Sequence, residues 1–259
     1  MMPINHLTWL KRVLLLAVVL SGLRGETRLL GQVAERSGYM TAIVRELQAD
    51  WPTNHAVNLV CHGHSVPAGY ARTPEVRTFD AYPYLLHRGL SGRFPHAVIN
   101  VIVTAIGGED SERGAARFVR DVMSLRPEVV TIDYALNDRR IGLVRAGKAW
   151  RSMIETALAA HVKVILLTPT GDSRAKLDDP EDPLNQHAKQ IRRLAAEYQV
   201  GLVDSLEAFK NYVQDGGKLA DLMAQVNHPN ERGHTLVADN LIKWFSCGIT
   251  TENKPASEK

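Results

Sequence analysis

The sequence contains few cysteines, no long basic run and no apolar run of bilayer length. Its two cysteines, Cys61 and Cys247, are too few for a disulfide framework or a zinc knuckle. Cys61 ends an apolar run, which favours a buried free thiol. Lysine and arginine alternate with aspartate and glutamate, and the formal net charge is only +3. We therefore expect no nucleic-acid partner.

An apolar run near the N-terminus, at residues 13–20, is too short to span a bilayer. The basic pair Lys11-Arg12 precedes it and small residues follow, which is the order of a signal peptide. We expect residues 1–25 to form a signal peptide or an N-terminal anchor, without a stable membrane span. A secreted or periplasmic protein is favoured. The alternative is a cytoplasmic protein that begins with an ordinary helix, and the sequence leaves the oligomeric state open.

The remaining chain alternates between two kinds of segment. With 259 residues, of which 45% are hydrophobic and 23% charged, it suits one large globular domain, predicted over residues 26–247 before a mobile tail at 248–259. Runs rich in β-branched residues predict strands at 57–60, 98–103, 129–132, 162–167 and 200–203. Helical periodicity recurs at 115–125, 144–160, 184–198 and 232–245. This alternation predicts an α/β fold: a flavodoxin-like three-layer α/β/α sandwich with a five-stranded parallel sheet.

Ligands bind parallel sheets at the carboxyl ends of the strands, so polar residues that follow a strand are candidates for chemistry. Four clusters of small and polar residues occupy such places, at 61–70, 105–111, 134–138 and 227–234. A serine hydroxyl needs a base to become nucleophilic, and the tetrahedral intermediate needs hydrogen-bond donors. The clusters supply Ser65 as nucleophile, His228 as base, and Gly108 and Asn137 as donors.

The four clusters resemble, in order, the four sequence blocks of the SGNH (GDSL-like) hydrolase superfamily. The family's Gly-Asp-Ser, single Gly, Gly-x-Asn-Asp and Asp-x-x-His-Pro correspond here to Gly63-His64-Ser65, Gly108, Ala135-Leu136-Asn137-Asp138 and Gln225-Val226-Asn227-His228-Pro229. The resemblance spans about residues 56–245 and implies a serine esterase that forms an acyl-enzyme on Ser65. It further implies an oxyanion hole made by the backbone N–H groups of Ser65 and Gly108 and the Asn137 amide, with no cofactor and no metal. The implied partner is a small ester, with an acetyl ester of a carbohydrate favoured; the acidic segment 174–185 also favours a polar substrate.

Three residues depart from the family pattern. His64 replaces an aspartate outside the catalytic set, and Ala135 replaces a glycine. Gln225 occupies the place of the triad acid, so another group must orient His228. Its acceptor is predicted to be a backbone carbonyl in the loop before His228, with the Gln225 side chain second and Asp221 third.

Other interpretations stay open from the sequence. His62 and His64 could form a metal pair in a metal-dependent hydrolase, with Asp133 and Asp138 as further ligands. Alternatively, the unusual blocks could belong to a catalytically inactive binding module. A second match to Gly-Asp-Ser, at Gly171-Asp172-Ser173, is interpreted as an ordinary turn. His187 and His234 fall on predicted helices and are interpreted as surface or core histidines.

Overall fold

The computed structural model describes residues 31–246, whose centre is a five-stranded parallel sheet. The strands are β1 (Ala56–Gly63), β2 (Val98–Val103), β3 (Val129–Asp133), β4 (Lys163–Leu167) and β5 (Gly201–Val203). Their order across the sheet is β2-β1-β3-β4-β5, with every pair parallel. This is the flavodoxin-like order, so the predicted fold class is confirmed.

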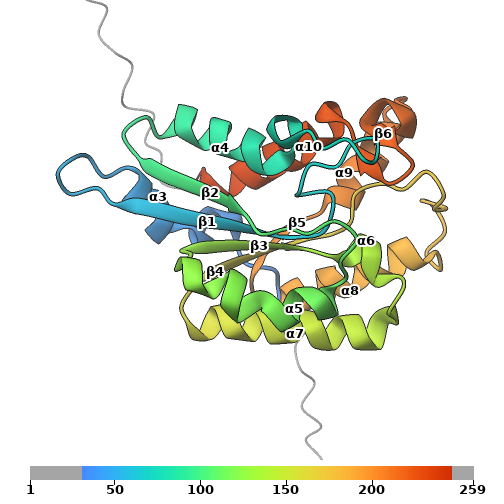
Figure 1. Ribbon diagram of the computed structural model, residues 1–259, viewed down its shortest axis with the longest axis horizontal. Helices are drawn as coiled ribbons and strands as arrows, with labels where there is room; N and C mark the ends of the chain where they lie inside the picture. The colour runs from blue at the N-terminus through green and yellow to red at the C-terminus, as the bar shows by residue number, and fades with distance from the viewer. Residues whose placement is uncertain (1–30, 247–259) are drawn as a thin grey trace, which may run out of the picture. The chain divides into compact units, whose positions relative to one another are not determined.

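Helices cover both faces of the sheet (Figure 1). One face packs against α4 (Tyr82–Arg93), α9 (Ser205–Gln214) and α10 (Glu231–Ile242), and the other against α5 (Ser111–Asp121), α7 (Gly142–Ala159) and α8 (Pro183–Tyr198). Shorter helices are α2 (Arg36–Tyr39), α3 (Thr41–Leu47) and α6 (Ala135–Asp138). In Figure 1, α3 lies at the left and α6 at the right, where β1 and β3 end.

Local sequence signals explain where several helices begin. The Asp110 side chain accepts the Arg113 N–H and starts α5 at Ser111, four residues before the predicted start. Asp182 caps α8 in the same way and is followed by Pro183 in the first turn. Periodicity did not predict α4, which contains two glycines and a proline, nor α9, which is short and follows β5 directly.

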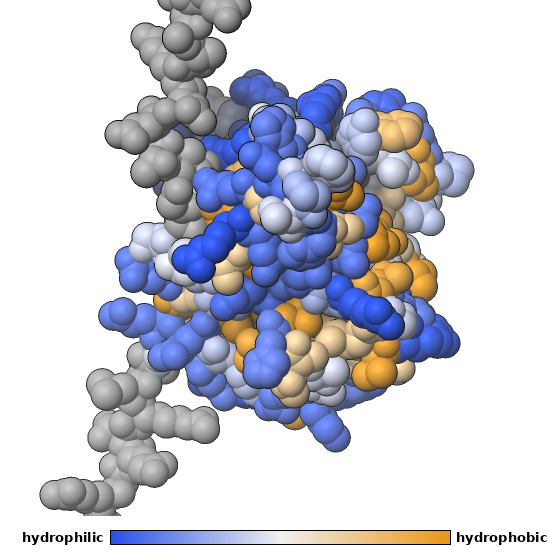
Figure 2. Space-filling model, turned by 90° about the vertical axis from the view of Figure 1, so that its left-hand side faces the viewer, coloured by the Kyte–Doolittle hydropathy of each residue, from blue (hydrophilic) through white to orange (hydrophobic). Residues whose placement is uncertain are grey.

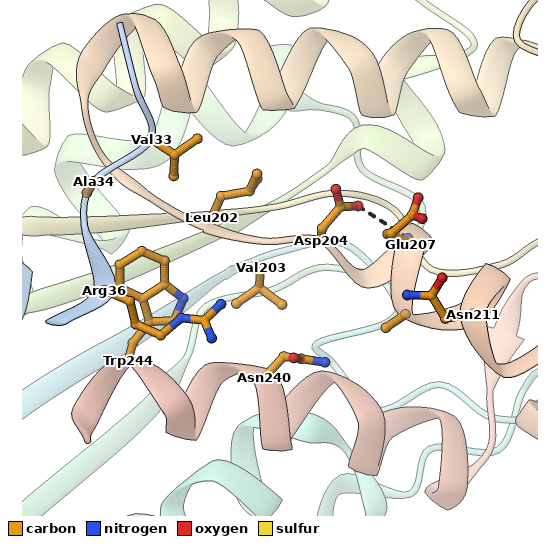
Figure 3. A pocket seen from close by; sticks show the side chains of 11 residues that line it. Val33, Ala34, Arg36, Leu202, Val203, Asp204, Glu207, Asn211, Asn240 and Trp244 are labelled. Carbon is orange, nitrogen blue, oxygen red and sulfur yellow. Dashed lines mark hydrogen bonds between the residues drawn. The ribbon is translucent and has the colours of Figure 1, made fainter. Parts of the chain in front are cut away.

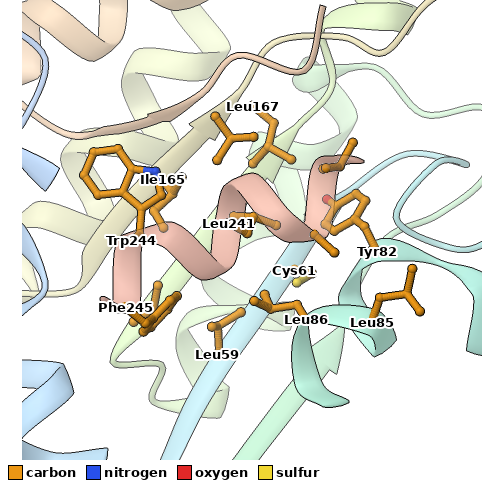
Figure 4. Close-up of a cluster of buried hydrophobic side chains, with 14 of the residues drawn as sticks. Leu59, Cys61, Tyr82, Leu85, Leu86, Ile165, Leu167, Leu241, Trp244 and Phe245 are labelled. Atoms are coloured by element: carbon orange, nitrogen blue, oxygen red, sulfur yellow. The ribbon is translucent and has the colours of Figure 1, made fainter. Parts of the chain in front are cut away.

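The apolar core lies on both sides of the sheet. Figure 4 shows the side formed by β1, β4, α4 and α10, with Leu59, Leu86, Leu241 and Trp244 packed together. Cys61 belongs to this cluster and is a free, buried thiol, as predicted. Burial raises the pKa of its thiol to about 12, so it stays protonated and unreactive.

The surface is predominantly polar where Figure 2 views it, at the end that carries α3. Among the described residues, no helix is long and apolar enough to cross a membrane. The predicted signal peptide at residues 1–25 and the predicted tail at 248–259 lie outside the described residues.

Candidate active site

Ser65 lies in a tight turn just after β1. A Cβ at Gly63 would come within 2.5 Å of the Asp133 carbonyl oxygen, so the turn requires glycine where the ends of β1 and β3 meet. The Ser65 carbonyl accepts the Tyr70 N–H at 3.0 Å, which closes the turn. Ser65 is therefore held at the carboxyl edge of the sheet.

His228 reaches Ser65 from a small antiparallel ribbon that the sequence analysis did not predict. The ribbon pairs β6 (Met223–Gln225) with β7 (His228–Pro229) just before α10. Nε2 of His228 lies 2.9 Å from Oγ of Ser65, although the two residues are separated by 163 positions. Ser65 is 6% exposed and His228 is 5% exposed, so the contact is largely shielded from water.

The other ring nitrogen of His228 has two neighbours, which favour different tautomers. Nδ1 lies 3.0 Å from the Ala71 carbonyl oxygen and 2.7 Å from Nε2 of Gln225. The amide orientation of Gln225 is set by Thr73, whose backbone N–H donates to Oε1 and whose hydroxyl accepts from Nε2. A proton on Nδ1 bonds to Ala71 and leaves Nε2 free as a base. The amide of Gln225 instead favours the tautomer in which Nε2 carries the proton.

A second imidazole, that of His64, lies next to the nucleophile. Nδ1 of His64 accepts the Val66 N–H at 3.2 Å and lies 3.4 Å from Oγ of Ser65. Because Nδ1 is an acceptor, the proton of neutral His64 is on Nε2, which lies 3.4 Å from Oδ1 of Asp133. Both side chains of this pair are at most 3% exposed. The hydroxyl of Tyr82 contacts the other Asp133 oxygen at 3.4 Å.

Besides the Ser65 N–H, the predicted oxyanion donors are Gly108, in the loop before α5, and Asn137, in α6. Gly108 has φ of +79°, a conformation that glycine adopts without strain. Nδ2 of Asn137 donates to the Glu109 carbonyl at 2.8 Å, which uses one of its two hydrogens and ties α6 to the loop of Gly108. Within residues 31–246, the backbone N–H groups of Ser65 and Gly108 donate to no protein acceptor.

A buried network of polar side chains fixes the loop that contains Gly108 and Glu109. Nε and Nη2 of Arg117 both donate to Glu109, and Nη2 also donates to the Tyr134 hydroxyl at 3.1 Å. The Tyr134 hydroxyl lies 3.0 Å from Nε2 of His62, whose Nδ1 lies 2.9 Å from the Thr104 hydroxyl. Burial lowers the pKa of His62 to about 4, with the Arg117 charge as the next cause. His62 is therefore neutral and structural, with both nitrogens engaged.

The structure does not bring the proposed metal ligands together. His62 bonds to Thr104 and Tyr134, whereas His64 contacts Asp133. Asp138 accepts from the Ser111 N–H and the Trp150 indole N–H, both at 2.7 Å, and burial raises its pKa to about 6. In the described part of the chain, no three His, Cys, Asp or Glu side chains form a group that could hold a metal ion.

The remaining sequence candidates take structural places. Asp221 lies in a 3-10 turn (Leu219–Leu222), and its carboxylate accepts the Lys218 backbone N–H and the Tyr212 hydroxyl, not an N–H of His228. His187 and His234 are both buried in helices. Nδ1 of His234 accepts the Tyr82 N–H.

The second Gly-Asp-Ser match forms a turn that places its aspartate among arginines. Asp172 is fully buried and bonds to both Arg139 and Arg174, while the Ser173 N–H donates to the Val226 carbonyl. Sequence reasoning did not identify Ala71 and Thr73, which contact His228 and Gln225, nor the pairing of Asp172 with the two arginines. The backbone carbonyl that contacts Nδ1 of His228 belongs to Ala71, after β1, and not to the loop before His228 where it was predicted. A backbone acceptor leaves no trace in residue type, so only the structure locates it.

A separate groove of about 510 Å³ runs beside β5 (Figure 3). Asp204 lies at its edge and is ion-paired with Arg192, and Arg36 stacks over Trp244 at the other end. The described residues that line it include neither Ser65 nor His228. This groove is therefore not part of the candidate active site.

Comparison with known proteins gives relatives of the same fold. A variant of Axe2, an acetyl-xylooligosaccharide esterase from Geobacillus stearothermophilus, is 21% identical with a TM-score of 0.65, over 77% of this chain and 96% of that one. A two-domain esterase active on acetylated mannans is 19% identical with a TM-score of 0.66, over 89% of this chain and 58% of that one. No curated protein matches the sequence.

The family model gives the assignment. The model of the GDSL-like lipase/acylhydrolase family matches residues 61–236, which is more than half of the chain and contains both Ser65 and His228. The sequence resemblance to SGNH hydrolases is thereby confirmed. The chain belongs to the GDSL-like lipase/acylhydrolase family and is a carboxylic ester hydrolase.

Proposed function

We propose that this protein hydrolyses short acyl esters, acetyl esters above all, of a carbohydrate or another small polar substrate. The observation that carries the proposal is the 2.9 Å contact between Oγ of Ser65 and Nε2 of His228 at the carboxyl edge of the sheet. Catalytic mutants of Axe2, an acetylxylan esterase, replace a serine and a histidine by alanine, which supports the same pair of roles here.

The first half of the reaction forms an acyl-enzyme. Nε2 of His228 accepts the Ser65 proton while Oγ attacks the ester carbonyl, and Nδ1–H donates to the Ala71 carbonyl. The negative charge that develops on the carbonyl oxygen is stabilised by the backbone N–H groups of Ser65 and Gly108 and by the second hydrogen of the Asn137 amide. His228 then gives its proton to the departing alcohol. In the second half, water attacks the acyl carbonyl with His228 again as base, and acid and Ser65 are released.

The absence of a triad acid, whose place Gln225 takes, should lower the rate but leave the steps of the reaction unchanged. A carbonyl oxygen at Nδ1 orients the imidazole but carries no charge to stabilise the imidazolium. The fold still provides the nucleophile, base and oxyanion donors, which together retain much of the catalytic effect. These groups favour an active esterase over an inactive binding module.

Hydrolysis of aryl acetates and acetylated sugars by the purified chain tests the proposal. Wild type should release acetate, Ser65→Ala should abolish the release, and a serine-directed phosphonate should label Ser65. Ser173→Ala is the matched control, because it alters the exposed serine of the second Gly-Asp-Ser match and should leave the rate unchanged. Labelling of Ser173, or activity that persists without Ser65 and disappears with a chelator, would overturn the assignment.

A further inference from the structure

A second groove, of about 550 Å³, opens beside the candidate active site. Asn137 and Asn227 line it, and these residues belong to the oxyanion block and to the segment just before His228. Arg139, Arg140 and Arg174 also line it. Ser65 and His228 do not line this groove, but it shares Asn137 with the predicted oxyanion hole and contains three guanidinium groups.

Two of these arginines are fixed by one buried carboxylate. Nη2 of Arg139 donates to Oδ2 of Asp172 at 2.6 Å, and Nε and Nη2 of Arg174 donate to its two oxygens at 3.0 and 2.9 Å. Asp172 is fully buried, whereas the Arg174 side chain is 62% exposed. One negative charge thus faces two positive charges, and the guanidiniums retain outward-facing N–H donors.

The third arginine has no acidic partner in the described structure. Nη2 of Arg140 donates to the Gly108 carbonyl, and no carboxylate among residues 31–246 lies within ion-pair distance of it. The carboxylate that lines the groove itself is Asp182, whose oxygens accept the Leu184 and Lys176 N–H groups at the start of α8. Counting Asp172 and Asp182, three guanidiniums face two carboxylates, and the groove keeps a net positive charge.

We propose that this groove is the subsite for an anionic substituent of the ester substrate, either a carboxylate, as in an acetylated uronic acid, or a sulfate or phosphate. The proposal rests on the esterase function proposed above and adds the substrate class. A guanidinium offers parallel N–H donors that match the oxygens of such groups, and prior fixation by Asp172 reduces the entropy lost on binding. In this proposal the anion and the scissile ester belong to one molecule, because Asn137 lines the groove and is also a predicted oxyanion donor.

Matched substrate pairs test the proposal. The value of kcat/KM is measured for an acetylated methyl glucoside, the corresponding methyl glucuronoside and the corresponding sulfated glucoside, at low and high salt. Wild type should prefer at least one anionic ester over the neutral one by roughly tenfold at low salt, and less at high salt, because exposed ion pairs are screened. The anionic ester with the higher kcat/KM shows whether the groove binds a carboxylate or a sulfate.

Variants connect that preference to the groove. Arg174→Gln and Arg140→Gln should each lower the anionic-to-neutral ratio severalfold, and Arg174→Glu should lower it further. Arg174 is the safer position for the fold, since Arg139 continues to pair with Asp172. Arg45→Gln is the control: this exposed arginine lies on α3, at the other end of the sheet, and its loss should leave the ratio unchanged.

The two proposals fail in distinguishable ways. A ratio of one or less in wild type, or a preference that survives Arg174→Glu and Arg140→Gln in folded protein, overturns the anionic subsite while Ser65-dependent hydrolysis of the neutral ester still stands. Absence of Ser65-dependent hydrolysis of all three esters overturns the esterase proposal itself. Circular dichroism of each variant establishes that the fold is intact.

Discussion

Replacing His64 by aspartate returns the residue of the family pattern to this chain, and we expect the replacement to destabilise the protein. Nδ1 of His64 accepts the Val66 N–H, and an aspartate oxygen is attached to Cγ in the same way, so that hydrogen bond can be retained. The remainder of the imidazole cannot be replaced. Its Nε2 lies 3.4 Å from Oδ1 of Asp133, and an aspartate leaves two carboxylates facing each other in a buried site.

The size of the effect follows from the geometry. With the carboxylates roughly 5.5 Å apart, Coulomb's law with an effective dielectric constant of about 20 gives a repulsion of about 3 kcal/mol, or about 2 pKa units. One carboxyl of the pair therefore has a raised pKa in the folded state. At low pH that carboxyl is protonated, so the two groups do not repel each other. As the pH rises through the raised pKa, the carboxyl ionises and the repulsion lowers the unfolding free energy.

Urea denaturation at pH 5 and pH 8 measures the effect. At pH 8, His64→Asp should lose about 3 kcal/mol of unfolding free energy relative to His64→Asn, which keeps the acceptor for Val66 without a charge. The difference in unfolding free energy between the two variants should be smaller at pH 5. Adding Asp133→Asn to His64→Asp should recover most of this loss of unfolding free energy. Equal stability of the two His64 variants at pH 8, or no recovery with Asp133→Asn, would refute the reasoning.

Four further outcomes are expected. Asn137→Ala should lower kcat by roughly 10²–10³ with little change in KM, because one oxyanion donor is lost; a normal kcat would remove Asn137 from the mechanism. Gln225→Ala should keep most activity while His228→Ala loses roughly 10⁴ or more, and equal losses in folded protein would make Gln225 the orienting group. The acid limb of kcat/KM should have its midpoint below pH 6.5, because burial lowers the pKa of His228; a midpoint above 6.5 would contradict this. Burial also lowers the pKa of His62 and His187 to about 4 and of His234 to about 3, so the unfolded chain takes up protons first as the pH falls, while the raised pKa of Asp138 offsets part of that loss. Urea denaturation should show about 4 kcal/mol less stability at pH 5 than at pH 7, and a flat profile would argue against neutral buried histidines.

The sheet and its site were predictable from the sequence because both follow from local patterns. Each strand is a short β-branched run, and the polar clusters follow the strands whose carboxyl ends meet at one edge. The contact between Ser65 and His228 therefore required only the strand order and the family blocks. The observed helix starts differ from the predicted ones by a few residues where a capping side chain, such as that of Asp110, sets the start.

Other features have no local signal. The ribbon of β6 and β7 contains strands of only three and two residues, which are too short to show alternation. The pairing of His64 with Asp133 depends on the register between β1 and β3, which places Gly63 opposite Asp133. The arginine groove depends on a turn, at Gly171-Asp172-Ser173, whose significance lies in its buried carboxylate and not in its serine.

The absence of a carboxylate beside His228 illustrates why residue type alone gives an incomplete account of such a site. The Ala71 carbonyl favours the tautomer that leaves Nε2 of His228 free to act as a base, whatever side chain residue 71 carries. Gln225 occupies the acid's place in the sequence, yet its amide, oriented by Thr73, donates toward the same nitrogen and favours the unproductive tautomer. Removing that amide therefore leaves the base intact, whereas replacing it by a carboxylate would supply both an acceptor and a charge. Gln225→Asp should accordingly raise the pKa of His228 and shift the acid limb of kcat/KM upward, with a gain in rate if the carboxylate reaches Nδ1.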